Sequence, residues 1–375
     1  MSIDERNSAS GFSRRRVLAA AAAGAAAPAI TAAGPAVAHS GTPHRPARKV
    51  GFVLSHEQFR TPQLVDFARH AERAGFDRVW ASDHTQPWQD NQGHSMFPWL
   101  TLSQVAETTR ALTFGTGVTC PLYRYHPTQV AQAFASLGIL APGRVFLGVG
   151  TGEALNELAS TGQFGRYPER HDRLAEAIDL IREVWTGRRV SFRGTYYRTE
   201  QYKLYDRPAR PVPIYVAASG PKSAYLAGQR GDGWITGAAD FAKPQLQDAF
   251  AAGAAAAGKD PRTMPKLVET FVVVGGKAEA EYAARRWRFT VDAFGDLLYV
   301  PNPVTIQQRA EQRWSLPQVY ANWPRGTDPD VHTAALQKII DAGGTPMVHS
   351  GQADQHRVID FYGEHVLPRL RFRHR

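Results

Sequence analysis

The sequence predicts an α/β fold, a (β/α)8 TIM barrel with insertions. Eight short and continuously apolar runs are spread along the chain, as expected of parallel strands covered on both faces. Amphipathic helical stretches separate these runs. Three junctions, AERAGFDRVWAS, AGQRGDGWIT and IIDAGGTPMVHS, repeat one pattern in which a helix ends on Gly and a strand follows. Eight strands alternating with helices favour a closed barrel; a doubly wound open sheet is the alternative.

The predicted elements follow in chain order. After the first strand, TPQLVDFARHAERAG reads as a helix with Thr61 at its N-cap, Pro62 at the first helical position and Gly75 at its end. Gly187 ends a second long helix in the same way. The segment 277–330 is too long for one connection, so we expect the largest insertion there, before the last strand. The strands are expected at residues 49–54, 78–82, 112–118, 144–149, 212–217, 233–236, 268–274 and 345–350.

The N-terminal segment carries the pattern of a targeting sequence. SRRRVL at residues 13–18 precedes an Ala-rich stretch that ends in Ala36-Val37-Ala38. This order is similar to a twin-arginine export signal cleaved after residue 38. We therefore expect a signal peptide over 1–38, a polar linker over 39–48 and the barrel over 49–375. The twin-arginine translocase would be a partner, and the cell envelope or periplasm the destination. A retained membrane anchor is the alternative.

The amino-acid composition limits the classes of function that the protein can have. The chain of 375 residues is 43% hydrophobic and 21% charged, enough for a sizeable core. Its net charge is +10, but Lys and Arg are scattered and no nucleic-acid-binding motif is present, so nucleic acid is not an expected partner. The single cysteine, Cys120, excludes an internal disulfide. The histidines show no metal-ligand spacing, and without a G-x-S-x-G motif serine hydrolysis has no support.

Two motifs at strand ends indicate chemistry, because barrel enzymes place their active sites at the carboxyl ends of the strands. WASDHTQPW, residues 80–88, sets His84 beside an acid and between two indoles, although an isolated histidine of this kind is often structural. In LGVGTGEALNE, residues 147–157, the glycines allow close approach of a flat or anionic ligand. Glu153 is either an acid beside that ligand or the cap of a helix that begins near it.

Two further strand ends could bind a ligand. In GTGVTCP, residues 115–121, Gly117 indicates a bulge against a ligand or a plain turn. AASGPKSA, residues 217–224, offers N–H groups, a hydroxyl and a lysine at the start of a helix. That combination suits a phosphate, although the same pattern is common in ordinary βα turns.

Taken together, SDHTQPW, GTGVTCP, RVFLGVGTGEALNE, YVAASGP and GDGWIT resemble the luciferase-like superfamily. The similarity covers roughly residues 48–373 and is strongest to the branch of glucose-6-phosphate dehydrogenases that use the deazaflavin coenzyme F420. It implies a hydride-transferring dehydrogenase with F420 as cofactor. The resemblance assigns the catalytic roles to His84 as base, Glu153 as proton donor to the coenzyme and Trp88 near the reaction centre. It assigns Glu57 to substrate binding and implies a strained or cis bulge at 117–118. It assigns coenzyme binding to Asp83, Gly117, Val118, Cys120, Thr151, Gly152, Asn156, Ser219, Gly220, Lys222 and Ser223.

The chain departs from that branch where the sugar phosphate would bind. The positions of the phosphate-binding cations align with Asp240, Leu297 and Asn322, and none of these is cationic. FGDLLYVPNP in the insertion is apolar instead. With the export signal, this indicates a lipid alcohol of the cell envelope and resembles the F420-dependent hydroxymycolic acid dehydrogenases, which form a ketomycolate. We also expect a homodimer. A flavin-dependent monooxygenase and a non-catalytic lipid-binding protein remain the alternatives.

Overall fold

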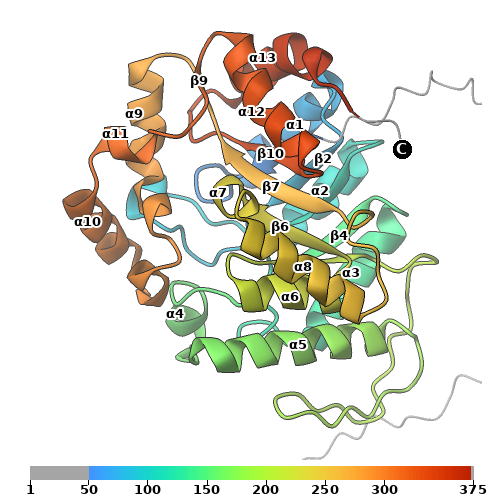
Figure 1. Cartoon of the computed structure of the whole chain (residues 1–375). Helices are drawn as coiled ribbons and strands as arrows, with labels where there is room; N and C mark the ends of the chain where they lie inside the picture. Colours follow the sequence, from blue (N-terminus) through green and yellow to red (C-terminus); the bar gives the residue numbers. More distant parts are fainter. Residues whose placement is uncertain (1–49, 373–375) are drawn as a thin grey trace, which may run out of the picture. The chain divides into compact units, whose positions relative to one another are not determined.

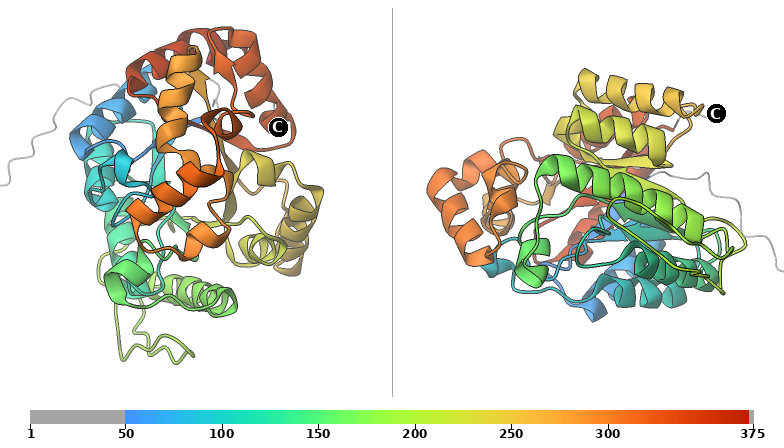
Figure 2. Two further views of the ribbon diagram at one scale, coloured as in Figure 1. Left: turned by 90° about the vertical axis from the view of Figure 1, so that its left-hand side faces the viewer. Right: turned by 90° about the horizontal axis from the view of Figure 1, so that it is seen from below.

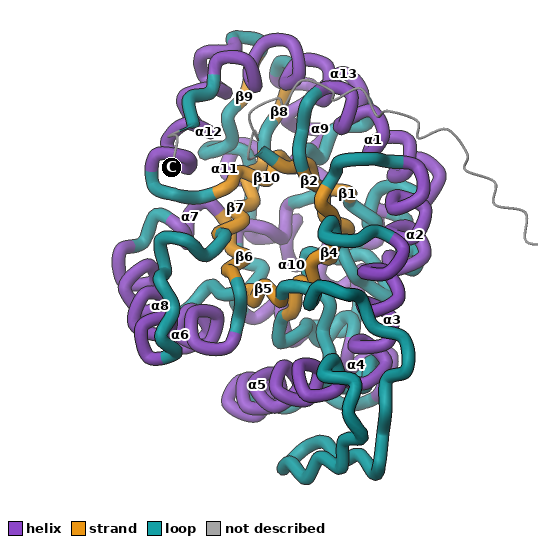
Figure 3. The backbone as a smooth tube through the Cα atoms, turned by 90° about the vertical axis from the view of Figure 1, so that its right-hand side faces the viewer, coloured by secondary structure: helices purple, strands orange, loops and turns teal. Residues whose placement is uncertain are grey.

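A closed barrel of eight parallel strands organises the chain. The computed structural model describes residues 50–372, and its strands follow the order β1-β10-β7-β6-β5-β4-β3-β2 around the ring (Figure 3). The predicted (β/α)8 barrel is confirmed, and the open sheet is excluded. The barrel strands are β1 (Gly51–Leu54), β2 (Arg78–Ala81), β3 (Thr113–Thr116), β4 (Val145–Val149), β5 (Ile214–Ala217), β6 (Gly233–Gly237), β7 (Lys266–Phe271) and β10 (Thr345–His349).

The seventh predicted strand is the one that differs most from the structure. The apolar run 268–274 is divided: β7 ends at Phe271, and β8 (Val273–Val274) pairs with β9 (Arg325–Gly326) in a separate two-stranded sheet. The backbone N–H of Val272 still donates to the carbonyl of His349, at 2.8 Å. The chain therefore leaves the barrel at Val272, and the second half of the run belongs to the insertion.

Helices surround the barrel (Figure 1). None within residues 50–372 has the length and apolar character needed to cross a membrane. The helices outside the insertion are α1 (Thr61–Ala74), α2 (Pro98–Thr108), α3 (Pro127–Leu140), α4 (Glu157–Thr161), α5 (Tyr167–Val184), α6 (Pro221–Arg230), α7 (Ala238–Phe241), α8 (Pro244–Ala256), α12 (Pro329–Asp341) and α13 (Gln355–Phe361).

The predicted ends of α1 are half correct. Gly75 does end the helix, with a left-handed φ of 101° that favours glycine. Thr61, however, is the first helical residue rather than the cap, and Pro62 is therefore the second; the Thr61 hydroxyl pairs with the Thr101 hydroxyl at 2.7 Å instead of capping the helix. Arg60 takes the N-cap position, and its backbone N–H donates to Gln63. Gly187 lies in the turn beyond α5, which already ends at Val184.

The segment between β7 and β10 packs on the loops that follow β2 and β4. It holds α9 (Lys277–Arg286), two short 3₁₀ turns (Arg288–Val291 and Asp296–Tyr299), α10 (Pro303–Arg313) and α11 (Leu316–Val319). Its carbonyls at Leu298 and Pro301 accept hydrogen bonds from the Ala154 N–H and the Gln86 amide, at 2.9 and 2.8 Å. In Figure 2 these helices (orange) stand together at one end of the barrel. The predicted signal peptide and linker lie outside the described residues.

Large side chains fill the barrel. The inward-facing cluster consists of Val53, Trp80, Phe146, Tyr215, Ile235, Leu267 and Met347, one from each of seven strands. Packing of this kind makes the barrel interior a solid core rather than a pore. The next inward position on each strand therefore forms the floor of any site at the mouth.

Candidate active site

His84, which follows β2, is held at both ring nitrogens. Its Nε2 lies 3.3 Å from Oε1 of Glu57, and its Nδ1 lies 2.7 Å from Nδ2 of Asn156. Only 10% of the imidazole is exposed. The side chain is thus fixed at the end of a barrel strand, where barrel enzymes place reactive groups.

The amide of Asn156 determines which nitrogen of His84 carries the proton. Its Oδ1 accepts from the backbone N–H of Thr85 at 2.8 Å, so its Nδ2 must face His84 and Glu153, the latter at 3.0 Å. Because the amide N–H donates to Nδ1, the neutral imidazole carries its hydrogen on Nε2, the ring nitrogen that lies nearer Glu57. One amide therefore links the predicted base and the predicted acid.

Glu57 sits in the loop after β1 and is almost fully buried, with 4% of its side chain exposed. Ser82 at the end of β2 donates its hydroxyl to Oε2 of Glu57 at 2.6 Å, and the backbone N–H of His56 donates to the same hydroxyl at 2.9 Å. The carboxylate is therefore anchored on one oxygen and directed at His84 with the other.

A buried charge cluster supports this arrangement from behind. Asp83 accepts from the Thr119 hydroxyl at 2.6 Å and from the Arg124 guanidinium at 2.9 Å, so both its carboxylate oxygens have protein donors. Arg124 also lies 3.6 Å from Glu157 and donates its backbone N–H to that carboxylate at 2.9 Å. Burial raises the pKa of Glu157, although Arg124 opposes the rise. Arg124 thereby links Asp83, which precedes His84 in the chain, to Glu157, which follows Asn156.

Glu153 does not cap a helix, contrary to the alternative suggested by the sequence. Helix α4 begins four residues later, at Glu157, with Asn156 at its N-cap. Glu153 lies in the preceding turn, half-buried, with its carboxylate held by Asn156. It is therefore a side-chain acid at the mouth of the barrel, close to His84.

Trp88 connects the site to the insertion. Its ring lies edge-on to His84, with centroids 6.0 Å apart, and stacks on Phe289 at 4.6 Å. Leu155 and Leu297 belong to the same buried cluster. The indole of Trp88 is thus one member of a series of aromatic contacts that starts at His84.

The glycine loop after β4 is tightly packed. Gly152 has φ 74°, and a Cβ there would lie 2.6 Å from Sγ of Cys120, so only glycine fits. Burial raises the pKa of the Cys120 thiol, which therefore stays protonated. Arg170, fully buried, donates to the carbonyls of Thr151 and Gly152 at 3.3 and 3.0 Å. The peptide bond between Gly117 and Val118 is cis, as the resemblance implied.

The predicted phosphate-binding residues lie at the start of α6. Gly220 occupies the N-cap, its N–H lies 3.3 Å from the Ser223 hydroxyl, and that hydroxyl donates to the Gly220 carbonyl at 3.0 Å. Ser219 and Lys222 are exposed. These residues make no direct hydrogen bond to the His84 cluster within residues 50–372.

The three positions that lack phosphate-binding cations differ in burial and in the contacts of their side chains. Leu297 is fully buried in the cluster around Trp88, and Asn322 is exposed. Asp240 forms an ion pair with Lys243 at 2.7 Å, which the sequence did not reveal. Part of the charge that would repel a phosphate there is therefore balanced.

The barrel mouth has room for a flat ring on one side. Gly148 and Gly237 follow the interior residues Phe146 and Ile235 by two positions and so share their face. A Cβ at Gly148 would lie 1.9 Å from the carbonyl oxygen of Thr116, so packing against β3 requires glycine there. A Cβ at Gly237 would meet no atom within 4 Å, which shows open space over β6. Small inward residues on these strands, with backbone N–H groups and a lysine at the start of α6, fit the deazaflavin ring and the phosphate of coenzyme F420. No group of three or more His, Cys, Asp or Glu side chains in the described part of the chain is arranged to hold a metal ion.

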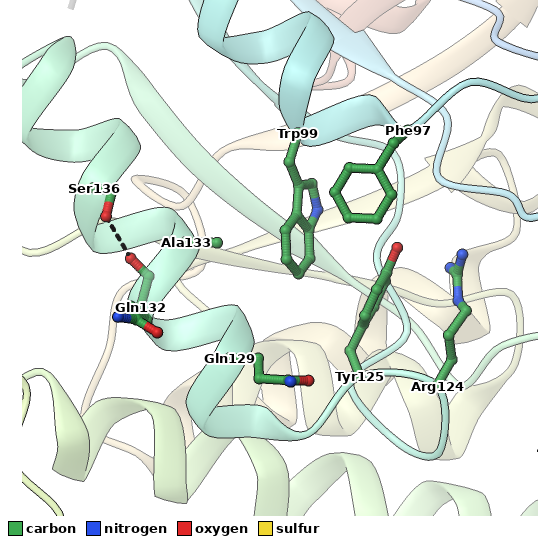
Figure 4. A pocket seen from close by; sticks show the side chains of 8 residues that line it. All are labelled: Phe97, Trp99, Arg124, Tyr125, Gln129, Gln132, Ala133 and Ser136. Atoms are coloured by element: carbon green, nitrogen blue, oxygen red, sulfur yellow. Dashed lines mark hydrogen bonds between the residues drawn. The ribbon is translucent and has the colours of Figure 1, made fainter. Parts of the chain in front are cut away.

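A separate pocket lies against α3 (Figure 4). Its volume is ≈ 600 Å³, and its lining is Phe97, Trp99, Arg124, Tyr125, Gln129, Gln132, Ala133 and Ser136. None of the residues predicted for the active site lines it. Its lining meets the active site through Arg124 and Tyr125, both of which contact Asp83, and through Trp99, whose indole N–H donates to Thr119 at 3.4 Å.

Sequence reasoning missed several residues that hold the site together. Arg124, Arg170, Ser82 and Thr119 each bond to a predicted site residue from another segment of the chain. Arg170 lies in a helix whose pattern gives no sign of this contact. Thr119 and Ser82 could have been suspected, because both lie within the strand-end motifs.

Fold and site together define a luciferase-like barrel. The profile of the family described as luciferase-like monooxygenase matches residues 18–339, and this chain belongs to that family.

Among its relatives, F420-dependent hydroxymycolic acid dehydrogenase of Mycobacterium tuberculosis is 60% identical over 330 residues, 88% of this chain and 90% of that protein. F420-dependent glucose-6-phosphate dehydrogenase of Nakamurella multipartita is 40% identical over 337 residues, 87% of this chain and 97% of that protein. The structure of an F420-dependent secondary alcohol dehydrogenase in complex with an F420-acetone adduct matches with a TM-score of 0.81 and 31% identity, covering 86% of this chain and 99% of that one.

Proposed function

We propose that this protein is a coenzyme F420-dependent dehydrogenase that oxidises a secondary alcohol to a ketone. One observation carries the proposal: His84 and Glu57 form a buried pair at the barrel mouth, joined through Asn156 to Glu153. The pair can take a proton from an alcohol, and Glu153 can supply one nearby. The identity of the coenzyme and the class of reaction in this proposal are taken from the names of the relatives and of the matching structure.

Coenzyme F420 would supply the hydride acceptor, and the chain supplies placement and proton transfer. The residues that would hold the ring are the glycines of the β3 and β4 ends, with Val118 and Cys120. The start of α6, from Ser219 to Ser223, would hold the phosphate.

The hydrogen-bond network divides the base function between two residues. Since Nε2 of neutral His84 carries a hydrogen, that N–H is placed to hold the alcohol oxygen. Glu57 then receives the alcohol proton, because its Oε1 is the nearest acceptor. In this proposal His84, predicted as the base, acts together with Glu57, which was predicted to face the substrate.

We propose a lipid alcohol of the cell envelope as substrate, with a hydroxymycolic acid as the specific candidate. Support comes from the 60% identical relative and from the apolar insertion beside Trp88. We also propose export by the twin-arginine translocase and a homodimeric assembly. The arginines at 14–16 support the export route.

The test combines coenzyme binding with turnover. Titration with oxidised F420, followed by absorbance, should show saturable binding, and secondary alcohols should reduce the coenzyme. His84→Ala and Glu57→Gln should each lower kcat by about a hundred- to ten-thousand-fold, the usual contribution of general base catalysis, while F420 binding persists. His365→Ala, at an exposed histidine, is the matched control. Absence of F420 binding, or oxygen consumption with reduced flavin mononucleotide, would refute the proposal and favour a monooxygenase.

A further inference from the structure

On the strands that follow β2 around the ring, a second set of polar side chains faces the barrel mouth. Ser55, Glu269 and His349 follow the interior residues Val53, Leu267 and Met347 by two positions on β1, β7 and β10. Side chains two residues apart on a strand share a face, so all three lie one layer above the barrel core.

These three side chains form a hydrogen-bonded chain. The Ser55 hydroxyl lies 2.7 Å from Nε2 of His349, and Nδ1 of His349 lies 2.7 Å from Oε1 of Glu269. An ionised Glu269 can only accept, so Nδ1 carries the imidazole hydrogen and Ser55 donates to Nε2. The order serine–histidine–acid is that of a hydrolytic triad.

The exposed fractions of these three side chains argue against a hydrolytic role. The Glu269 side chain is 35% exposed, the His349 side chain only 3%, and Ser55 is buried. The accessible end is therefore the carboxylate and not the serine. Within the described residues, no hydrogen bond reaches Oε2 of Glu269, so this oxygen is free to accept from a ligand.

An aromatic arc connects this chain to the reaction centre. Ring centroids follow one another from His349 to Trp287 at 4.4 Å, to Phe289 at 5.7 Å, to Trp88 at 4.6 Å and to His84 at 6.0 Å. Phe271 also stacks on His349, at 4.2 Å. Glu269 and His84 thus lie near the two ends of one stack of largely buried rings, which fixes how far apart the two side chains are held.

We propose that Glu269 is a specificity-determining acceptor for a second hydroxyl group of the substrate, several bonds away from the carbinol that His84 and Glu57 handle. Ser55 and His349 are positioning residues that fix its carboxylate. The preferred substrate is then an uncharged secondary alcohol with a further hydroxyl, and an anionic group at that end is disfavoured. The inference rests on the proposed dehydrogenase function.

The kinetic test compares a secondary heptanol with heptanediols that carry a second hydroxyl. In the wild type, kcat/KM should favour one of the diols by about tenfold, the usual effect of a hydrogen bond to a charged group. Glu269→Gln should remove most of this preference and raise the relative kcat/KM of the phosphate monoester of that diol. Ser55→Ala should reduce the preference through KM rather than kcat. Ser350→Ala, a buried serine whose hydroxyl contacts Gln352, is the matched control and should change neither.

A binding measurement provides a readout that does not depend on turnover. The ketone of the favoured diol, added to the protein with oxidised F420, forms a complex that cannot react, and calorimetry gives its Kd. Glu269→Gln should weaken this Kd about tenfold while leaving the Kd of the ketone without the hydroxyl unchanged. Equal loss for both ketones, no diol preference in the wild type, or tighter binding of an amino ketone than of the hydroxy ketone would overturn the inference. If the wild type neither binds F420 nor oxidises any alcohol, the proposed function fails instead.

Discussion

The two sides of the barrel mouth are built on different physical principles. We call the first the charged wall: Glu57, Asp83, His84, Arg124, Glu153, Asn156 and Glu157, joined by hydrogen bonds and ion pairs. The second is the aromatic wall: Phe271, Trp287, Phe289, Trp323 and His349, joined mainly by ring stacking. Trp88 touches both.

The difference indicates what each wall can tolerate. Hydrogen bonds and ion pairs between buried groups are directional, so the loss of one partner leaves an uncompensated charge. Stacked rings depend on shape and area, and a smaller ring loses contacts in proportion. The charged wall therefore fixes the chemistry, whereas the aromatic wall can adapt to different carbon chains.

Arg124→Met is the variant expected to destabilise the charged wall most. This change removes the cation shared by Asp83 and Glu157, both of whose side chains are fully buried. Unpairing a buried charge costs about 3–5 kcal/mol, and the variant should lose that much of its free energy of unfolding in denaturant titration. Arg188→Met, which breaks an exposed pair with Glu183, should cost less than about 1 kcal/mol. Similar losses in the two variants would contradict the role of Arg124.

A second prediction concerns His56, buried beneath the charged wall. Neither ring nitrogen has a hydrogen-bond partner, and burial together with nearby His84 lowers its pKa from 6.5 to about 4. The unfolded chain therefore binds the proton more readily, so stability is complete above pH 6.5 and falls as the pH drops toward 4. The shift corresponds to about 3 kcal/mol at most.

His56→Leu removes this titration. The difference in unfolding free energy between wild type and variant should move in favour of the variant as the pH falls from 6.5 to 4, measured by denaturant unfolding at each pH. His365→Ala, at an exposed histidine, should show no such trend. A constant difference across this range would rule out a buried neutral His56.

The two walls also differ in how far the sequence could predict them. His84, Trp88, Glu153 and Asn156 lie in short motifs directly after strands, and the alternation of strands and helices was enough to bring those motifs to one end of the barrel. The placement of the strands could be predicted because each is a local apolar run. The roles of these residues stay predictions until variants are measured.

The aromatic wall could not be predicted in the same way. Trp287 meets Gln58 across 229 residues of chain, and Glu269 meets His349 across 80. Such contacts depend on how the insertion folds back, which no local periodicity encodes. Even the division of the run 268–274 follows from its pairing with distant Arg325.

The smallest expected effect comes from Trp287→Phe, which should test the tolerance of the aromatic wall. Phenylalanine keeps most of the stacking on His349 and Phe289 but removes the indole N–H, which donates to the buried Gln58 amide oxygen at 2.5 Å. An unsatisfied buried acceptor costs about 1–3 kcal/mol, so the free energy of unfolding should fall by about 1–2 kcal/mol, less than for Arg124→Met. Trp314→Phe, in the same insertion but half-buried and without an indole hydrogen bond in the described structure, is the control for ring size. If Trp287→Phe instead costs as much as Arg124→Met, the aromatic wall depends on directional bonds after all, and the contrast between the two walls does not hold.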